Sequence, residues 1–81
     1  MNKIELKNLI ITELGNIAPE IEPEEIPEDQ DLREAIELDS MDFLNLVIAV
    51  SKQTKVAIPE ADYPLVVTLN GMVNYLIDKQ Q

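Results

Sequence analysis

The sequence predicts an all-α fold, a small four-helix bundle of three main helices plus a short third helix. Apolar residues recur at helical spacing near both ends of the chain, a middle segment lacks proline and glycine, and proline-rich sequence separates the first segment from the middle one. A chain of 81 residues can bury one modest core. We therefore expect residues 1–81 to form a single domain, with a long loop between the first and second helices.

The first helix is predicted at residues 3–15. Its apolar residues form one stripe at helical spacing, with Glu13 near the edge. Asn2 and Glu5 make a capping pair at its start, and Gly15 offers a stop at its end. Local signals thus define both ends of this helix.

The segment after the first helix is predicted to be a long loop. Each of its prolines lacks an amide hydrogen and disfavours helix at the preceding residue. A short turn of helix fits residues 31–35. Isolated apolar residues are expected to anchor the loop across the bundle: Ile17, Ile21, Ile26, Leu32 and Ile36.

The second main helix is predicted from Met41 to about Gln53. It has apolar residues on almost every side, which is too many for one buried face. We expect one broad face to be buried, made of Phe43, Leu46, Val47 and Val50. A second stripe should be partly exposed: Met41, Leu44 and Ile48.

Two further helices are predicted in the last third of the chain. Pro59 suits the first position of a short helix that Pro64 ends. Thr68 then caps a last helix that runs to about Lys79. Gly71 in that helix costs about 1 kcal/mol relative to alanine and marks close packing or room for a ligand.

The negative charge of the chain is local. The segment from Glu20 to Asp42 has eleven of the sixteen acids and one base, Arg33, so its net charge is −10, whereas the acids and bases elsewhere cancel. Such concentration attracts basic partners and repels nucleic acid and anionic membranes. The same charge also fits a solvated acidic loop without a partner.

The residue types that are missing exclude several kinds of chemistry. The chain has no cysteine and no histidine, which removes the usual zinc sites and both cysteine–histidine and serine–histidine–aspartate catalysis. It has no recognisable secretory signal and no apolar run long enough to span a bilayer. We expect a cytoplasmic protein that does not insert into membranes.

One serine is placed to be modified. Ser40 lies where acidic, broken sequence gives way to an apolar helix, in Leu38-Asp39-Ser40-Met41-Asp42. On local sequence alone it reads as an ordinary helix cap, with an outward hydroxyl. No general base partners it, so if Ser40 reacts, something else must activate it.

The motifs around this serine extend over nearly the whole chain. Ile58 and Pro59 follow eighteen and nineteen residues after Ser40, and Thr68 lies nine residues beyond Pro59. In this spacing the chain closely resembles acyl carrier proteins. The resemblance is carried by Asp39-Ser40-Met41-Asp42, Leu46-Val47, Val56-Ala57-Ile58-Pro59-Glu60, Thr68-Leu69 and Tyr75-Leu76.

The resemblance implies a covalent cofactor. Ser40 would accept a 4′-phosphopantetheine arm from coenzyme A, delivered by a phosphopantetheinyl transferase with magnesium, which Asp39 would help to position. Acyl groups would ride on the arm as thioesters and be presented to acyl-transferring or condensing enzymes of fatty-acid, polyketide or related biosynthesis. The protein would then be a carrier, not an enzyme, without a metal site of its own, and a monomer.

The resemblance also implies a docking surface, and here the chain departs from the family. Partner enzymes would dock on the helix after the serine, through Met41, Asp42, Leu44 and Ile48. Common fatty-acid carriers have several glutamates along that helix, where this chain has Asn45, Ser51 and Lys52. We therefore expect a specialised carrier with a more apolar docking surface.

Two other departures concern the cargo and the turn before the serine. In the family an acyl chain folds back among the helices, and the matching positions here are Phe43, Val47, Ile58, Tyr63, Val66 and Met72. Phe43 and Tyr63 are bulkier than the residues often found there, so they either fill the cavity and limit cargo length or replace other core volume. Glu37 stands where carriers usually have glycine, so the backbone before the serine is expected to turn differently.

Two rival interpretations remain, and a third fails the sequence pattern that it requires. The protein could carry aminoacyl or peptidyl groups, or it could be an unmodified acidic module that binds a basic protein. Calcium binding through Asp29 and Asp31 does not fit the loop pattern, because Glu34 occupies the position that needs glycine and Ser40 the position of the last ligand.

Overall fold

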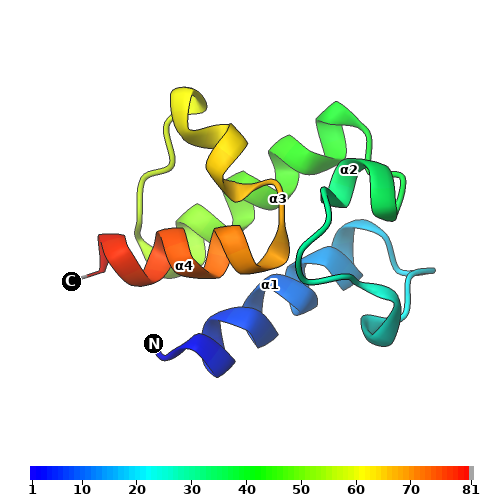
Figure 1. Cartoon of the computed structure of the whole chain (residues 1–81), viewed down its shortest axis with the longest axis horizontal. Coiled ribbons are helices and arrows are strands. Elements are labelled where there is room, and N and C mark those ends of the chain that lie inside the picture. The colour runs from blue at the N-terminus through cyan, green and yellow to red at the C-terminus, as the bar shows by residue number, and fades with distance from the viewer. Residues whose placement is uncertain (81) are drawn as a thin grey trace.

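The computed structural model describes residues 1–80 and confirms the all-α fold, since none of these residues lies in a strand. The start of helix α1 (Lys3–Ile17) and the end of helix α4 (Leu69–Lys79) lie at one end of the bundle, and the connection between α1 and α3 (Ser40–Thr54) lies at the other (Figure 1). Helix α1 packs against both α3 and α4. The elements in order are α1 (Lys3–Ile17), η1 (Pro23–Glu25), α2 (Leu32–Ala35), α3 (Ser40–Thr54), η2 (Glu60–Val66) and α4 (Leu69–Lys79).

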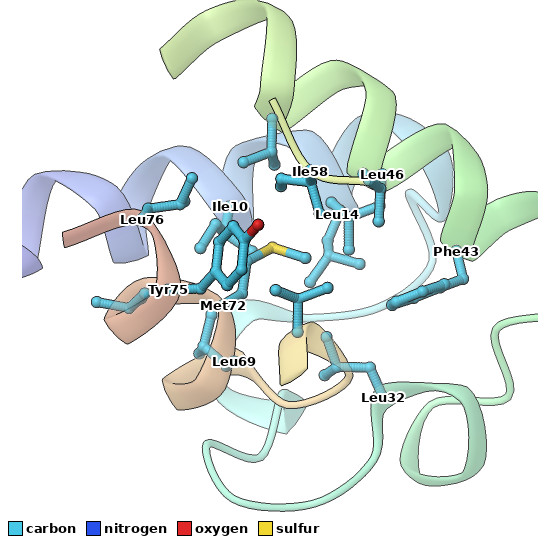
Figure 2. Close-up of a cluster of buried hydrophobic side chains, with 14 of the residues drawn as sticks. Ile10, Leu14, Leu32, Phe43, Leu46, Ile58, Leu69, Met72, Tyr75 and Leu76 are labelled. Carbon is cyan, nitrogen blue, oxygen red and sulfur yellow. The ribbon is translucent and has the colours of Figure 1, made fainter. Parts of the chain in front are cut away.

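A single apolar core joins the three long helices to the connections between them (Figure 2). Burial of this cluster supplies most of the free energy that offsets chain ordering. Within residues 1–80 no helix is long and apolar enough to cross a bilayer. The largest fully buried side chains are Leu6, Ile10, Leu14, Leu32, Leu46, Val50, Val66, Leu69, Met72 and Leu76.

The long connection is anchored as the sequence predicts. Ile26 and Leu32 are buried in the core, and the other three predicted anchors, Ile17, Ile21 and Ile36, are partly buried against it. The amide of Leu32 also donates to the carbonyl of Val67 at 2.9 Å, which ties α2 to the segment after η2. The predicted helical turn is α2, with Asp31 as its cap.

Helix α1 begins as predicted but ends later. The Asn2 side chain accepts from the amide of Glu5 at 2.8 Å, and the Glu5 carboxylate accepts from the amide of Asn2 at 3.1 Å. The predicted stop at Gly15 is wrong, because the helix continues to Ile17. Glycine permits a left-handed turn without requiring one, whereas Pro19 disfavours helix at Ala18, where the helix ends (φ −133°, ψ 75°).

The predicted end of the short helix at Pro64 is also wrong. Pro59 is the cap that precedes the helix and not, as predicted, its first residue, and η2 continues through Pro64 to Val66. A proline in a 3₁₀-helix removes only the one hydrogen bond that its own amide would donate to the carbonyl three residues earlier. Its φ of about −65° suits this helix type. The helix η1 is not anticipated in the sequence analysis, although Glu22 and Glu25 flank Pro23 with capping-box spacing.

Helix α4 is capped as predicted, and its glycine is there for close packing. The hydroxyl of Thr68 accepts from the amide of Gly71 at 2.9 Å. A Cβ at Gly71 would lie 2.6 Å from the carbonyl oxygen of Leu65 in η2. The hydroxyl of Tyr75 donates to the Asp62 carboxylate at 2.7 Å, which raises the pKa of Tyr75 and adds a second tie between α4 and η2.

Candidate functional site

Ser40 is the first residue of α3, one position earlier than the predicted start. The cap is Asp39, whose carboxylate accepts from the amide of Asp42 at 2.8 Å. The expectation that Ser40 itself caps the helix is therefore wrong, because the longer aspartate side chain takes that role. Ser40 is exposed, and its hydroxyl is not needed for the cap.

The start of α3 offers hydrogen-bond donors to an anion beside Ser40. Amides in the first turn of a helix have no acceptor within it, and the cap at Asp39 satisfies only that of Asp42. This leaves the amides of Ser40 and Met41, together with the positive end of the helix dipole. Such a donor set suits a phosphodiester. The residues present therefore fit a phosphate group attached to the Ser40 hydroxyl.

The turn that leads into α3 is strained at Glu37. This residue has φ 55°, in the left-handed region that favours glycine. The backbone therefore adopts at this position a conformation in which a glycine would be comfortable, and the glutamate bears the cost of its Cβ.

Replacing Glu37 with glycine is expected to raise the free energy of unfolding by about 1 kcal/mol, because the left-handed conformation is then unstrained. Urea denaturation measures this. Glu37→Ala is the matched control, since it removes the same charge and keeps the Cβ. If alanine stabilises as much as glycine, the gain comes from the charge and not from the backbone.

The predicted docking residues all lie on α3 and differ in exposure. Met41 and Ile48 are 65% and 45% exposed, whereas Asp42 and Leu44 are half-buried. The predicted partial exposure of the second apolar stripe is confirmed. Leu65 in η2 is 60% exposed and adds an apolar side chain that the sequence analysis does not select.

The three positions that depart from common carriers are not equivalent. Asn45 and Lys52 are exposed, but Ser51 is half-buried and its hydroxyl donates to the carbonyl of Val56 at 2.7 Å. This hydrogen bond supports the turn after α3, where Lys55 adopts φ 59°. Of these three positions, only Asn45 and Lys52 are exposed on the surface of α3.

A pocket of about 440 Å³ opens beside Ser40. Of the six predicted cargo residues, Phe43 and Tyr63 line it, with their rings edge to face and centroids 5.9 Å apart. The other four are buried in the core and do not line this pocket: Val47, Ile58, Val66 and Met72. The remaining lining residues are Arg33, Ser40, Leu44, Glu60, Pro64 and Val67.

Arg33 brings a positive charge to this pocket. Its Nε and Nη2 donate to the two carboxylate oxygens of Asp31 at 3.1 and 2.8 Å. This pair lowers the pKa of Asp31 and raises that of Arg33. The guanidinium carbon lies 5.7 Å from the centroid of the Phe43 ring, within the range of a cation–π contact. In the sequence, Arg33 stands out only as the single base of the acidic segment.

A helical bundle that presents an exposed serine at the start of a long helix is an arrangement that suits a carrier domain. The chain matches the family model described as phosphopantetheine attachment site over residues 5–76, and it belongs to this family. A comparison with curated proteins finds no match. Domains of this family are attachment sites for covalent 4′-phosphopantetheine and are carriers rather than catalysts.

Proposed function

We propose that this chain is a specialised acyl carrier protein, which holds acyl intermediates as thioesters on a 4′-phosphopantetheine arm attached to Ser40. The observation that carries the proposal is the exposed Ser40, freed from capping by Asp39, at a helix start in a phosphopantetheine-family chain. The arm supplies the thiol that a chain without cysteine lacks. The helix start provides the phosphate with amide donors.

The proposal assigns roles to the surroundings of Ser40. A phosphopantetheinyl transferase adds the arm with magnesium, which Asp39 helps to position. Biosynthetic enzymes that transfer or condense acyl groups then dock through Met41, Asp42, Leu44 and Ile48 on α3. The protein acts as a monomer in the cytoplasm, and the acidic segment before Ser40 favours basic partners over nucleic acid.

Incubation with coenzyme A, magnesium and a phosphopantetheinyl transferase is expected to increase the intact mass by one arm. Ser40→Ala is expected to abolish the increase, because alanine has no oxygen to bond to phosphorus. Ser51→Ala is the control and should be modified normally. An unchanged mass for the native chain, or an arm that persists in Ser40→Ala, would contradict the proposal. Loading with amino acids in place of acyl groups would indicate an aminoacyl carrier.

The specialisation of the carrier can be tested at the two open positions of α3. Asn45→Glu with Lys52→Glu is expected to raise kcat/KM with fatty-acid synthase enzymes by roughly 2- to 10-fold at low salt, because charges at a docking rim act mainly on association. Ser51 is left unchanged because its hydroxyl supports the turn at Val56.

A matched control places the same change in charge on α1. Lys3→Glu with Asn8→Glu alters two exposed residues away from the docking surface. It should leave kcat/KM unchanged. Equal gains in both double variants would mean that total charge, and not its position on α3, decides partner choice.

A further inference from the structure

The pocket beside Ser40 combines aromatic walls with groups that can donate and accept hydrogen bonds. Phe43 and Tyr63 supply the rings, and Arg33 and Glu60 supply the polar groups. Because Ser40 also lines the pocket, an acyl group on its arm has a cavity within reach. The inference below rests on the proposed attachment of the arm to Ser40.

The core behind these rings is already filled. Val47 is 2% exposed, and Val66 and Met72 are fully buried. These side chains belong to the packed cluster that joins α1, α3 and α4, and none of them lines the pocket. Interiors are packed to near crystal density, so a long saturated chain could enter only by displacing core side chains. An acyl group that outgrows the pocket of about 440 Å³ must therefore displace core side chains, and this cost favours a short acyl group over a long one.

Arg33 and Glu60 differ in the hydrogen bonds that they can make to a bound group. Asp31 engages Nε and Nη2 of Arg33, which leaves the two N–H donors of Nη1 outside that pair. No ion pair engages Glu60 within residues 1–80, so its carboxylate oxygens can accept hydrogen bonds. The pocket lining thus offers both a donor and an acceptor.

The charges around the pocket limit which polar group the bound acyl chain can carry. Arg33 and Asp31 neutralise each other, and Glu60 and the acidic segment leave a negative field, which opposes an acyl group that ends in a carboxylate. An ammonium group could pair with Glu60 but cannot accept a hydrogen bond from Arg33. A hydroxyl is neutral, accepts from Arg33 and donates to Glu60.

We infer that the pocket beside Ser40 selects a short, neutral, hydroxyl-bearing acyl group, with Arg33 and Glu60 as the residues that determine specificity. One portion of the protein is first treated with coenzyme A and must gain the arm by intact mass, so that failure to add the arm contradicts the proposed function and not this inference. Separate portions of unmodified protein then receive the arm with its acyl group already attached: the transferase moves the acylated arm to Ser40 from 3-hydroxybutyryl, butyryl, succinyl, β-alanyl or octanoyl coenzyme A.

The 3-hydroxybutyryl group is expected to give the largest shifts of the Phe43 and Tyr63 amide resonances in ¹⁵N–¹H spectra. Its thioester should hydrolyse about 3- to 10-fold more slowly than the butyryl thioester, the effect of one or two net hydrogen bonds. Arg33→Met and Glu60→Ala should each reduce that protection. Lys3→Met, which removes one positive charge at an exposed site on α1, should retain it.

Three results would overturn the inference. Equal shifts and equal hydrolysis for butyryl and 3-hydroxybutyryl would show that the polar groups do not select. Larger effects for succinyl or β-alanyl would show that a charged group is preferred. Large shifts of the Val47 and Met72 amides with octanoyl would show that a long chain enters the core.

Discussion

Replacing Gly71 with alanine is expected to lower the free energy of unfolding by about 2–3 kcal/mol, a large part of the ~3–5 kcal/mol expected for a core of this size. The new Cβ would lie 2.6 Å from the carbonyl oxygen of Leu65 and 2.8 Å from the Thr68 hydroxyl. The first is backbone, so η2 and α4 must move apart. The second is the cap of α4, whose hydrogen bond to the Gly71 amide would be disturbed.

Gly15→Ala is the matched control for this prediction. It is also a glycine inside a helix, but nothing lies within 4 Å of a Cβ built there. Alanine at this position is expected to raise the free energy of unfolding by about 0.5–1 kcal/mol through its helix propensity. Urea denaturation of both variants should thus give changes of opposite sign. A gain in stability in both would mean that η2 yields easily to α4.

The same substitution connects stability to the pocket. Helix η2 carries Leu65 and also Glu60 and Tyr63, which line the pocket beside Ser40. A displacement of η2 by the alanine should therefore shift the amide resonances of Tyr63, whereas Gly15→Ala should not. The glycine of α4 in this way determines how closely one wall of the pocket approaches the bundle.

Features that depend on neighbouring residues could be predicted from the sequence. The caps at Asn2 and Thr68 follow from side chains three residues from the amides that they accept from, and both are observed. The anchors Ile26 and Leu32 follow from isolated apolar residues in an otherwise polar segment, which have no stable place except the core.

Features that depend on competition or on tertiary contacts could not be predicted in the same way. Gly15 and Pro19 both signal a helix end, and only the structure shows that the proline decides it. The position of Arg33 in the pocket depends on its contacts with Asp31, two residues before it, and with Phe43, which lies on another helix. The sequence shows that Arg33 is the single base in an acidic segment, but it does not show where in the fold this side chain lies.

Asp39→Asn is expected to keep the stability of the protein and to slow its modification. In the structure Asp39 caps α3, and in the proposed function its carboxylate also helps to position magnesium for the transferase. Asparagine caps helices about as well as aspartate, so the free energy of unfolding should change by less than about 0.5 kcal/mol. The loss of the carboxylate should lower the rate of arm transfer by roughly 10- to 100-fold, as found for groups that orient a metal site.

Asp39→Ala separates the two roles, since it removes the cap and the charge together. Its modification should be as slow as that of Asp39→Asn, while its free energy of unfolding falls by about 1 kcal/mol through loss of the hydrogen bond to the Asp42 amide. Asp42→Asn controls for the loss of one negative charge beside Ser40. The rate of arm transfer, followed by intact mass over a magnesium titration, distinguishes these variants. If Asp39→Asn is modified at the native rate at every magnesium concentration, Asp39 is a helix cap only, and the transferase positions its metal without it.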